Sequence, residues 1–287
     1  MKIPSNLIAA WLLLPLVTAL AAADTNKMLT VDLGQGKVVE MPDTSDAAHR
    51  LNLLRLKLEL LYAADFSKPL KFVKEADLFS GGQRTHLPRD MDWVLEGKAT
   101  ARTEEGRLIL KNDPGHLTFW NTREFPSNVL IQFEVSPADS NKGLNIVFFA
   151  ARGRDGGSIF ALDQPIRDGL FKNYTSGAIN CYHTSYWASD PAGAVRGTAH
   201  IRKNFGSHLV AMGRDFVGGQ GAGPHRVRVL KLGNRITVEA DGKIEVHWED
   251  DGKTFGPVLH NGWIGLRQMA HTGECRYTNF KVWAVNP

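Results

Sequence analysis

The sequence predicts an all-β protein, a jelly-roll sandwich of two antiparallel sheets. Short β-type runs such as 106–112, 128–136 and 225–233 follow one another from about residue 66 to the C-terminus, and Gly, Pro, Asn or Asp separates many of them. In many of these runs apolar and polar residues alternate, which gives a strand one face for a core and one for solvent. Many short strands of this kind pack as two antiparallel sheets.

The first 23 residues have the composition of a secretory signal peptide. Lys2 supplies a positive start, an apolar run follows, and small residues precede a cleavage site after Ala21 or Ala23. The apolar run is too short for a comfortable membrane span, and no later segment approaches the ~20 apolar residues that a spanning helix needs. We therefore expect an exported protein, periplasmic or secreted, with no membrane association once the signal is removed.

Residues 24–59 are expected to form an N-terminal extension before the sandwich domain, which we place at 60–287. A hairpin around Gly34 and Gly36 is expected first. Residues 43–54 then begin like a capped helix. Leucines at 54, 56, 58 and 60 alternate as in a strand, whereas those at 51, 54, 58 and 61 fit a helical stripe equally well. We expect a short helix that passes into a strand.

Charge is distributed unevenly along the chain. Between Pro191 and Val238 the only acidic residue is Asp215. The basic residues of the same stretch are Arg196, Arg202, Lys203, Arg214, Arg226, Arg228, Lys231 and Arg235. A basic face favours an anionic partner, and an ordinary solvated surface is the alternative. Nucleic acid is a poor candidate for an exported chain without a nucleic-acid motif.

Paired carboxylates for glycoside hydrolysis are not indicated. Glu239, Asp241 and Glu245 imitate such a pattern, but Asp241-Gly242 is a hairpin signal that puts Asp241 at a turn and Glu245 on the next strand. Residues 250–252 are expected to form a loop, with a structural calcium ion as the minor alternative. No G-x-S-x-G, H-E-x-x-H or C-x-x-C motif is present, and no cofactor or catalytic metal is predicted. Cys181 and Cys275 leave both a disulfide and two buried thiols open.

The stretch INCYHTSYW, residues 179–187, is expected to be a strand with two different faces. Alternation places Asn180, Tyr182 and Tyr186 on one face, and we expect them to line a wet sugar groove. The opposite row, which includes His183, could belong to the core and leave His183 semi-buried. An irregularity near Ser185 would bring His183 and Tyr186 together.

Two long connections, 153–178 and 188–208, flank this strand and are expected to wall a cleft over it. The second carries Arg202 beside Lys203, and an arginine fork suits a carboxylate or sulfate. In 262–270, Trp263 and Arg267 share one face and would make a sugar platform beside an anion clamp. The alternative is that Trp263 covers the core and Arg267 satisfies a buried carbonyl or acid.

Several motifs, in order over roughly residues 60–285, resemble the YesU-like family of uncharacterised bacterial proteins. They are FFAARGRDG, YTSGAINCYHTSYW, IRKNFGSHLVAMGRD, WEDDGKTFGPVL, GWIGLRQMA and YTNFKVWAV. The resemblance implies a concanavalin-like jelly roll and a role in the breakdown of uronic-acid-containing polysaccharides. By motif match it carries over Tyr182, His183, Ser185, Tyr186, Arg202, Lys203, Asn204, His208, Asp215, Arg267 and Gln268.

The hypothesis that follows is an exported protein that acts on an acidic polysaccharide by β-elimination, which makes it a polysaccharide lyase. Elimination needs cations to neutralise the uronate, a base and an acid. The catalytic candidates are His183, Tyr186, Tyr182 and Arg202. The substrate-binding candidates are Asn180, Lys203, Asn204, His208, Asp215, Trp263, Arg267 and Gln268. The alternatives are a glycoside hydrolase that uses Asp215, Glu134 or Glu239, and a non-catalytic carbohydrate-binding module. The oligomeric state is left open.

Overall fold

The computed structural model describes residues 27–33, 37–45 and 53–286. The predicted signal peptide and most of the predicted N-terminal helix lie outside the described residues. The strands are β1 (Met28–Asp32), β2 (Val38–Pro42), β3 (Lys57–Ala63), β4 (Phe72–Lys74), β5 (Phe79–Ser80), β6 (Gln83–Arg84), β7 (Trp93–Glu104), β8 (Arg107–Asn121), β9 (Val129–Pro137), β10 (Leu144–Gly153), β11 (Ile179–Ala188), β12 (Thr198–Asn204), β13 (His208–Arg214), β14 (His225–Leu232), β15 (Arg235–Ala240), β16 (Lys243–Glu249), β17 (Trp263–Gln268) and β18 (Glu274–Asn286). The helical turns are η2 (Leu53–Arg55), η3 (Glu75–Leu78), α1 (Lys172–Thr175) and η4 (Ala270–Thr272).

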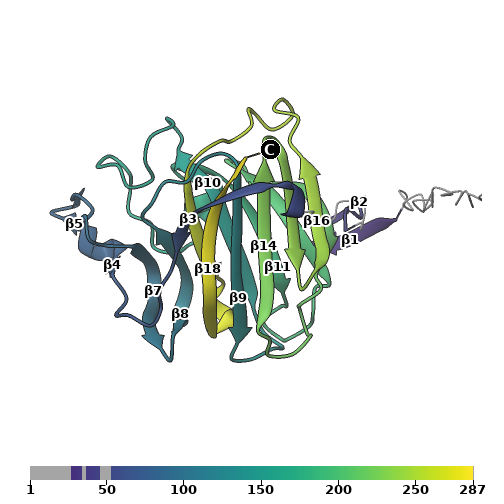
Figure 1. Ribbon diagram of the computed structural model, residues 1–287, viewed down its shortest axis with the longest axis horizontal. Coiled ribbons are helices and arrows are strands. Elements are labelled where there is room, and N and C mark those ends of the chain that lie inside the picture. The colour runs from purple at the N-terminus through teal and green to yellow at the C-terminus, as the bar shows by residue number, and fades with distance from the viewer. Residues whose placement is uncertain (1–26, 34–36, 46–52, 287) are drawn as a thin grey trace, which may run out of the picture.

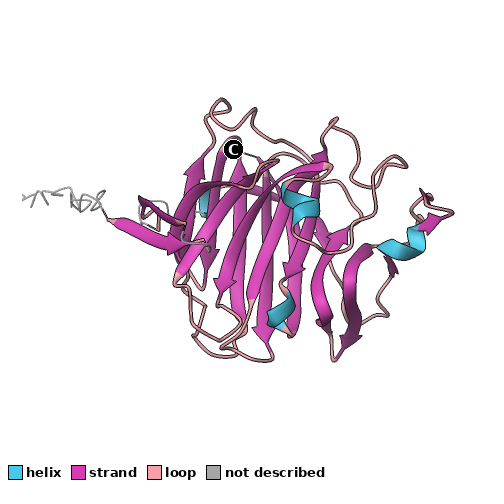
Figure 2. Cartoon of the chain, turned by 180° about the vertical axis from the view of Figure 1, so that it is seen from behind, coloured by secondary structure: helices cyan, strands magenta, loops and turns pink. Residues whose placement is uncertain are grey.

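The strands form two packed layers, as predicted. Hydrogen-bonded neighbours follow the order β13–β12–β11–β10–β17–β8–β18–β9–β14–β15–β16. We call the layer from β13 to β17 sheet A and the layer from β18 to β16 sheet B. The long strand β8 joins them, because its C-terminal half pairs with β17 and its N-terminal half with β18. Sheet B faces the viewer in Figure 1, and Figure 2 shows the molecule from the side of sheet A.

The main core lies between the two sheets and is rich in aromatic side chains. Phe119 stacks on Trp93 with ring centres 4.7 Å apart, and Phe133 lies in edge contact with Tyr186. At the open edge the layers touch through Gly213 of β13, where an added Cβ would overlap the carbonyl oxygen of Glu245 in β16. A glycine here allows the two sheets to close on one another.

A second apolar cluster covers the outer face of sheet A. Trp120 and Phe148 of the sheet pack against Phe160 and Tyr174, which belong to the long connection 154–178. We call this connection the insertion. Figure 2 shows α1, which is part of the insertion, in front of the strands. Residues 153–178 therefore do lie over the strand 179–187, but they cover it with packed aromatic side chains and do not wall the expected open cleft.

The N-terminal region is attached to the sandwich at two places. β1 and β2 form the predicted antiparallel hairpin, and β3 is the predicted strand and pairs with β18. Asp43, which follows the hairpin, accepts a hydrogen bond of 2.8 Å from the Arg214 side chain in β13. The domain boundary at residue 60 stays a prediction, although β3 crosses it. Within the described ranges no helix has the length and apolar character that a membrane crossing requires.

The prediction of a long loop over residues 188–208 is wrong for its second half. Residues 198–204 form β12, which pairs with β11 and β13. Ala199 and Ile201 are buried in the core, whereas His200 and Arg202 point the other way. This alternation is a strand signal that the basic character of the segment obscured.

The hairpin signal at Asp241-Gly242 is confirmed. Both residues have positive φ, 49° and 81°, as a two-residue turn between β15 and β16 requires. Glu245 is buried on β16, and Glu239 pairs with Arg228 at 3.0 Å. The three acidic residues therefore do not form a catalytic pair.

Candidate functional site

Strand β11 presents the opposite faces to those we predicted. Tyr182 and Tyr186 are fully buried between the sheets, so the expectation that they line a groove is wrong. Their rings pack against core aromatics, and the Tyr182 hydroxyl donates to Asp250 at 2.5 Å. Burial raises the pKa of both phenols, which removes them as bases at neutral pH.

The predicted irregularity near Ser185 is present but has a different effect. Asn145 of β10 pairs with Trp187 and Ile146 pairs with Ser185, so Tyr186 is left over as a bulge residue. The bulge lets the neighbouring rings of Tyr186 and Trp187 both enter the core. It keeps Tyr186 on the face opposite His183 instead of bringing the two together.

The outer face of sheet A carries a row of polar side chains. His183 pairs with Arg202 and Ser185 pairs with His200 across β11 and β12, and Arg267 lies two strands away opposite Ile146. Residues directly opposite each other in such pairs have neighbouring side chains. We call the group on this face the basic cluster. Its members are His183, Ser185, Arg196, His200, Arg202 and Arg267.

The arginines of the basic cluster hydrogen-bond to uncharged acceptors. Arg196 donates to the Ser185 hydroxyl at 2.7 Å, Arg202 donates to the carbonyl of Ser207 at 2.7 Å, and Arg267 donates to the carbonyl of Gly169 at 2.8 Å. Within the described part of the chain none of these three arginines has a carboxylate within 4.0 Å. The three arginines therefore lack a direct ion pair, although more distant carboxylates still attract two of them, Asp215 acting on Arg196 and Glu96 on Arg267.

The two histidines of the cluster are held neutral. His183 is 2% exposed, and its Nδ1 lies 2.8 Å from the Asn204 amide nitrogen. Burial lowers the pKa of His183 well below its ordinary value, and the charges of Arg202, Arg267 and Arg196 lower it further. Burial and the same basic surroundings lower the pKa of His200. With Asn204 donating to Nδ1, the proton of neutral His183 lies on Nε2.

A buried ionic network, which the sequence did not reveal, holds the insertion on sheet A. Glu96 of β7 accepts hydrogen bonds from Arg167 at 2.7 Å and from the Tyr174 hydroxyl at 2.6 Å. Glu75 accepts from the Arg84 side chain and from the Arg167 backbone. All five side chains are buried. A charged residue within the apolar run of β7 was the one available signal.

Four predicted binding residues lie away from the basic cluster. Lys203 is buried and donates to Asp250 at 2.7 Å, and Gln268 donates to the Tyr277 hydroxyl at 3.0 Å. Both point to the opposite side of sheet A, since their neighbours Arg202 and Arg267 occupy the outer face. His208 stacks on Phe255, and Asn180 is half-buried on the same side as Tyr182.

Asp215 and Trp263 have structural contacts that account for them. Asp215 accepts hydrogen bonds from the backbone of Ala188, Val217 and Gly218, and so closes the loop after β13. Trp263 shares the outer face with Arg267, as predicted, but it is 7% exposed and packs in edge contact with Phe160 of the insertion. It is covered and offers no open platform.

Metal ligands do not converge anywhere in the described residues. The carboxylates of the turn suggested for calcium already accept hydrogen bonds within the protein. Asp250 accepts from Lys203 and Gly252, and Asp251 accepts from Lys253 and Thr254. Calcium binding stays a prediction. Cys181 and Cys275 are both free and buried.

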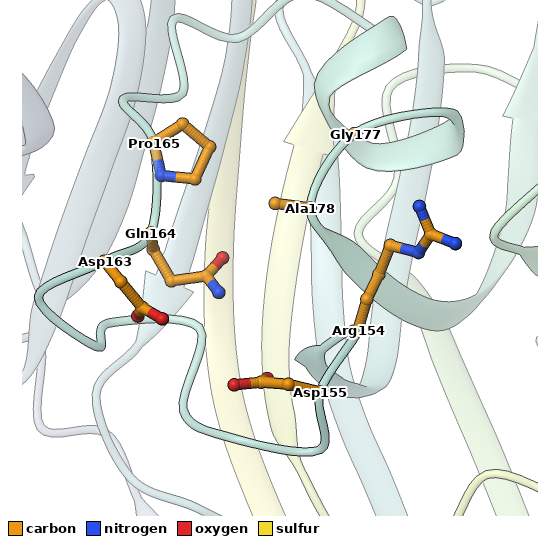
Figure 3. A pocket seen from close by; sticks show the side chains of 7 residues that line it. All are labelled: Arg154, Asp155, Asp163, Gln164, Pro165, Gly177 and Ala178. Atoms are coloured by element: carbon orange, nitrogen blue, oxygen red, sulfur yellow. The ribbon is translucent and has the colours of Figure 1, made fainter.

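A recess of about 730 Å³ lies beside the insertion (Figure 3). It is lined by Arg154, Asp155, Asp163, Gln164, Pro165, Gly177 and Ala178. None of these residues belongs to the basic cluster, so the structure offers two separate polar surfaces. We call this recess the insertion pocket.

We expect Arg167→Met to lower the free energy of unfolding by about 3–5 kcal/mol, because Glu96 would remain buried without its cation. Urea denaturation measures this loss, and limited proteolysis should cut residues 154–178 faster. Lys172→Met, an exposed change in the same insertion, is the control and should have little effect. Equal stability of the two variants would show that the ion pair does not anchor the insertion.

We expect stability to fall as the pH drops below about 6.5, the ordinary pKa of histidine. His183 and His200 stay neutral in the folded chain, so the unfolded chain binds more protons in this range. Each contributes up to about 1.4 kcal/mol per pH unit. His183→Gln or His200→Gln should flatten the dependence measured by urea denaturation, whereas the exposed His86→Gln should not. An unchanged slope in both buried variants would contradict this account.

Comparison with known proteins places the chain in a family. A family model described as "Domain of unknown function (DUF1961)" matches residues 85–282. The chain is 36% identical over 197 residues to "Uncharacterized protein YesU" of Bacillus subtilis (strain 168), which covers 67% of this chain and 88% of that protein.

Solved structures are also similar. A protein of unknown function with a galectin-like fold from Bacillus subtilis has 30% identity and a TM-score of 0.66, covering 80% of this chain and 98% of that one. A carbohydrate-binding module from Bacillus subtilis has 14% identity and a TM-score of 0.45, covering 67% of this chain and 94% of that one. The motif resemblance and the fold are thus confirmed, and the chain belongs to the DUF1961 family and is a relative of YesU.

Proposed function

We propose that this protein binds an acidic, uronic-acid-containing saccharide at the basic cluster. The observation that carries the proposal is the convergence of Arg196, Arg202 and Arg267 without a carboxylate partner. Buried charges in proteins are ordinarily paired, because an unpaired charge away from water is costly. A ligand carboxylate would supply the missing partner, and the planar guanidinium group binds carboxylates through two parallel hydrogen bonds.

The accessible part of the cluster determines where a carboxylate would lie. Arg267 is 0% exposed beneath Phe171 and Tyr174, so it would attract the ligand carboxylate electrostatically without contacting it. Arg196 and Arg202 are half-buried, and the charges of both act on His200. We therefore place the carboxylate at Arg196 and Arg202. We propose the uronate class because of the YesU-like motifs, and export because of the composition of residues 1–23. A mature N-terminus at Ala22 or Asp24, measured by mass spectrometry, would support export.

β-Elimination is the reaction that the cluster supports best. A base must remove the proton next to the uronate carboxylate, the bond to the leaving oxygen breaks as a carbon–carbon double bond forms, and the leaving oxygen takes up a proton. The arginines would stabilise the negative charge that develops on the carboxylate. His183 and His200 are neutral, which is the state that a base requires. The lone pair of His183 lies on Nδ1 and accepts from Asn204, so His183 would take the substrate proton only after the substrate displaces that amide.

Hydrolysis is less well supported. Glu134 accepts hydrogen bonds from Thr278 and Asn279 on sheet B, and Glu239 is paired with Arg228. The Asp215 carboxylate is held by backbone amides. None of these three carboxylates belongs to the basic cluster, and hydrolysis needs two of them across one glycosidic bond.

Arg202→Gln is expected to weaken binding of an oligogalacturonate by about tenfold to a hundredfold, the loss of a hydrogen bond between charged groups. Isothermal titration calorimetry at low salt measures it. The control is Arg235→Gln on sheet B, where Arg235 lies 3.7 Å from Glu249 and is largely exposed. Unchanged affinity in Arg202→Gln, or an equal loss in both variants, would refute the assignment of the cluster.

If the protein is a lyase, incubation with polygalacturonan, rhamnogalacturonan, glucuronan, alginate or ulvan should release an ultraviolet-absorbing unsaturated uronate from one of them. His183→Ala should abolish the product while the oligosaccharide still binds, because the arginines remain. Reducing sugar without new absorbance would indicate hydrolysis. Binding without any product would leave a carbohydrate-binding module and exclude elimination on these substrates.

A further inference from the structure

The insertion pocket is built by three parts of one connection. Arg154 and Asp155 follow the end of β10, Gly177 and Ala178 precede β11, and Asp163 to Pro165 lie midway between them. Figure 3 shows these three parts facing one another around an open space. The space measures about 730 Å³ and is open to solvent, so it would hold part of a ligand at the surface.

Gln164 presents an unsatisfied amide to this pocket. Its side chain points into the space in Figure 3, and the residue is only 7% exposed. Its backbone is fixed, because its carbonyl accepts from Arg84 at 3.3 Å and its N–H donates to Ala161 at 3.0 Å. Its side-chain oxygen is buried and has no hydrogen-bond partner among the described residues. Buried polar groups are rarely left in this state, which indicates a ligand that contacts the amide.

The charges around the amide favour an uncharged ligand. Asp155 and Asp163 contribute two carboxylates and Arg154 one guanidinium group, so the lining is acidic overall. The Asp155 carboxylate is held in place by the Gly157 N–H at 2.9 Å. Arg154 lies 4.0 Å above the ring centre of Phe205, which is exposed beside it. Carboxylates accept hydrogen bonds from hydroxyl groups, whereas an anionic ligand would be repelled.

We propose that the insertion pocket binds a neutral, hydroxyl-rich sugar residue. This rests on the proposed function, since it takes the ligand of the chain to be a saccharide. Asp155, Asp163 and the Gln164 side-chain oxygen accept from its hydroxyl groups, and Arg154 and the Gln164 amide nitrogen donate to them. Asn204 contacts His183 of the basic cluster, and the next residue, Phe205, contacts Arg154. The two surfaces are therefore neighbours, and one polymer with acidic and neutral residues could occupy both.

Ligand-observed NMR titrations test this with the methyl glycosides of galactose, glucose, mannose, xylose and rhamnose, and with methyl galacturonide for comparison. At least one neutral glycoside should bind the full chain. Gln164→Ala and Asp163→Asn should each weaken that binding by about fivefold to tenfold. Asp163 is exposed, so its variant does not put folding at risk. Asp113→Asn, an exposed change on β8, should alter affinity by no more than about twofold.

The outcomes separate this inference from the proposed function. Arg202→Gln should lose the acidic ligand and keep the neutral one. Binding of acidic saccharide without any neutral glycoside would overturn the pocket and leave the basic cluster standing, and absence of both would overturn both. If a neutral glycoside binds and Asp163→Asn leaves its affinity unchanged, the assignment of the pocket would also be overturned. Thermal stabilisation by calcium alone, lost in Asp163→Asn, would identify a cation site instead.

Discussion

The buried ion pair between Glu96 and Arg167 is the interaction on which both polar surfaces depend. It joins β7 of the sandwich to the insertion, and the Tyr174 hydroxyl completes it from α1. Removal of one partner would leave an unpaired buried charge, which costs several kcal/mol. The ion pair therefore stabilises the packing of the insertion on sheet A. Its position brings the carbonyl of Gly169 to Arg267, and residues 163–165, which line the insertion pocket, lie close to Arg167 in the chain.

The second constraint is the alternation of β11. One face supplies Tyr182 and Tyr186 to the space between the sheets, and the other supplies His183 and Ser185 to the outer face. A rigid strand therefore fixes the polar row, and its neighbours β12 and β17 add the arginines in register. Sites on such elements hold their geometry better than sites on loops. Neutral histidines follow from the same arrangement, because a proton on His183 would lie among three positive charges in a buried position.

The fold could be predicted from the sequence, because alternation and turn residues are local signals that a two-sheet sandwich obeys throughout. The faces of β11 could not. Both rows of its side chains contain aromatic residues. Which row faces the core depends on residues distant in the sequence, such as Phe133 and Phe149, which pack on Tyr186 and Tyr182. Charge composition drew attention to Arg202, whose role in binding stays a prediction, whereas Arg267 satisfies a buried carbonyl, which was the alternative. The charge of Glu96 within the apolar run of β7 was a local signal, but its partner Arg167 could not be predicted, since the two residues lie 71 positions apart.

The central claim is that a uronate carboxylate completes the unpaired charges of the basic cluster. A crystal structure with a bound acidic oligosaccharide tests it most directly. The account predicts one carboxylate within hydrogen-bond distance of the Arg196 and Arg202 guanidinium groups, on the outer face of sheet A. An oligosaccharide bound on sheet B, or one bound on sheet A with every carboxylate directed into solvent, would contradict it.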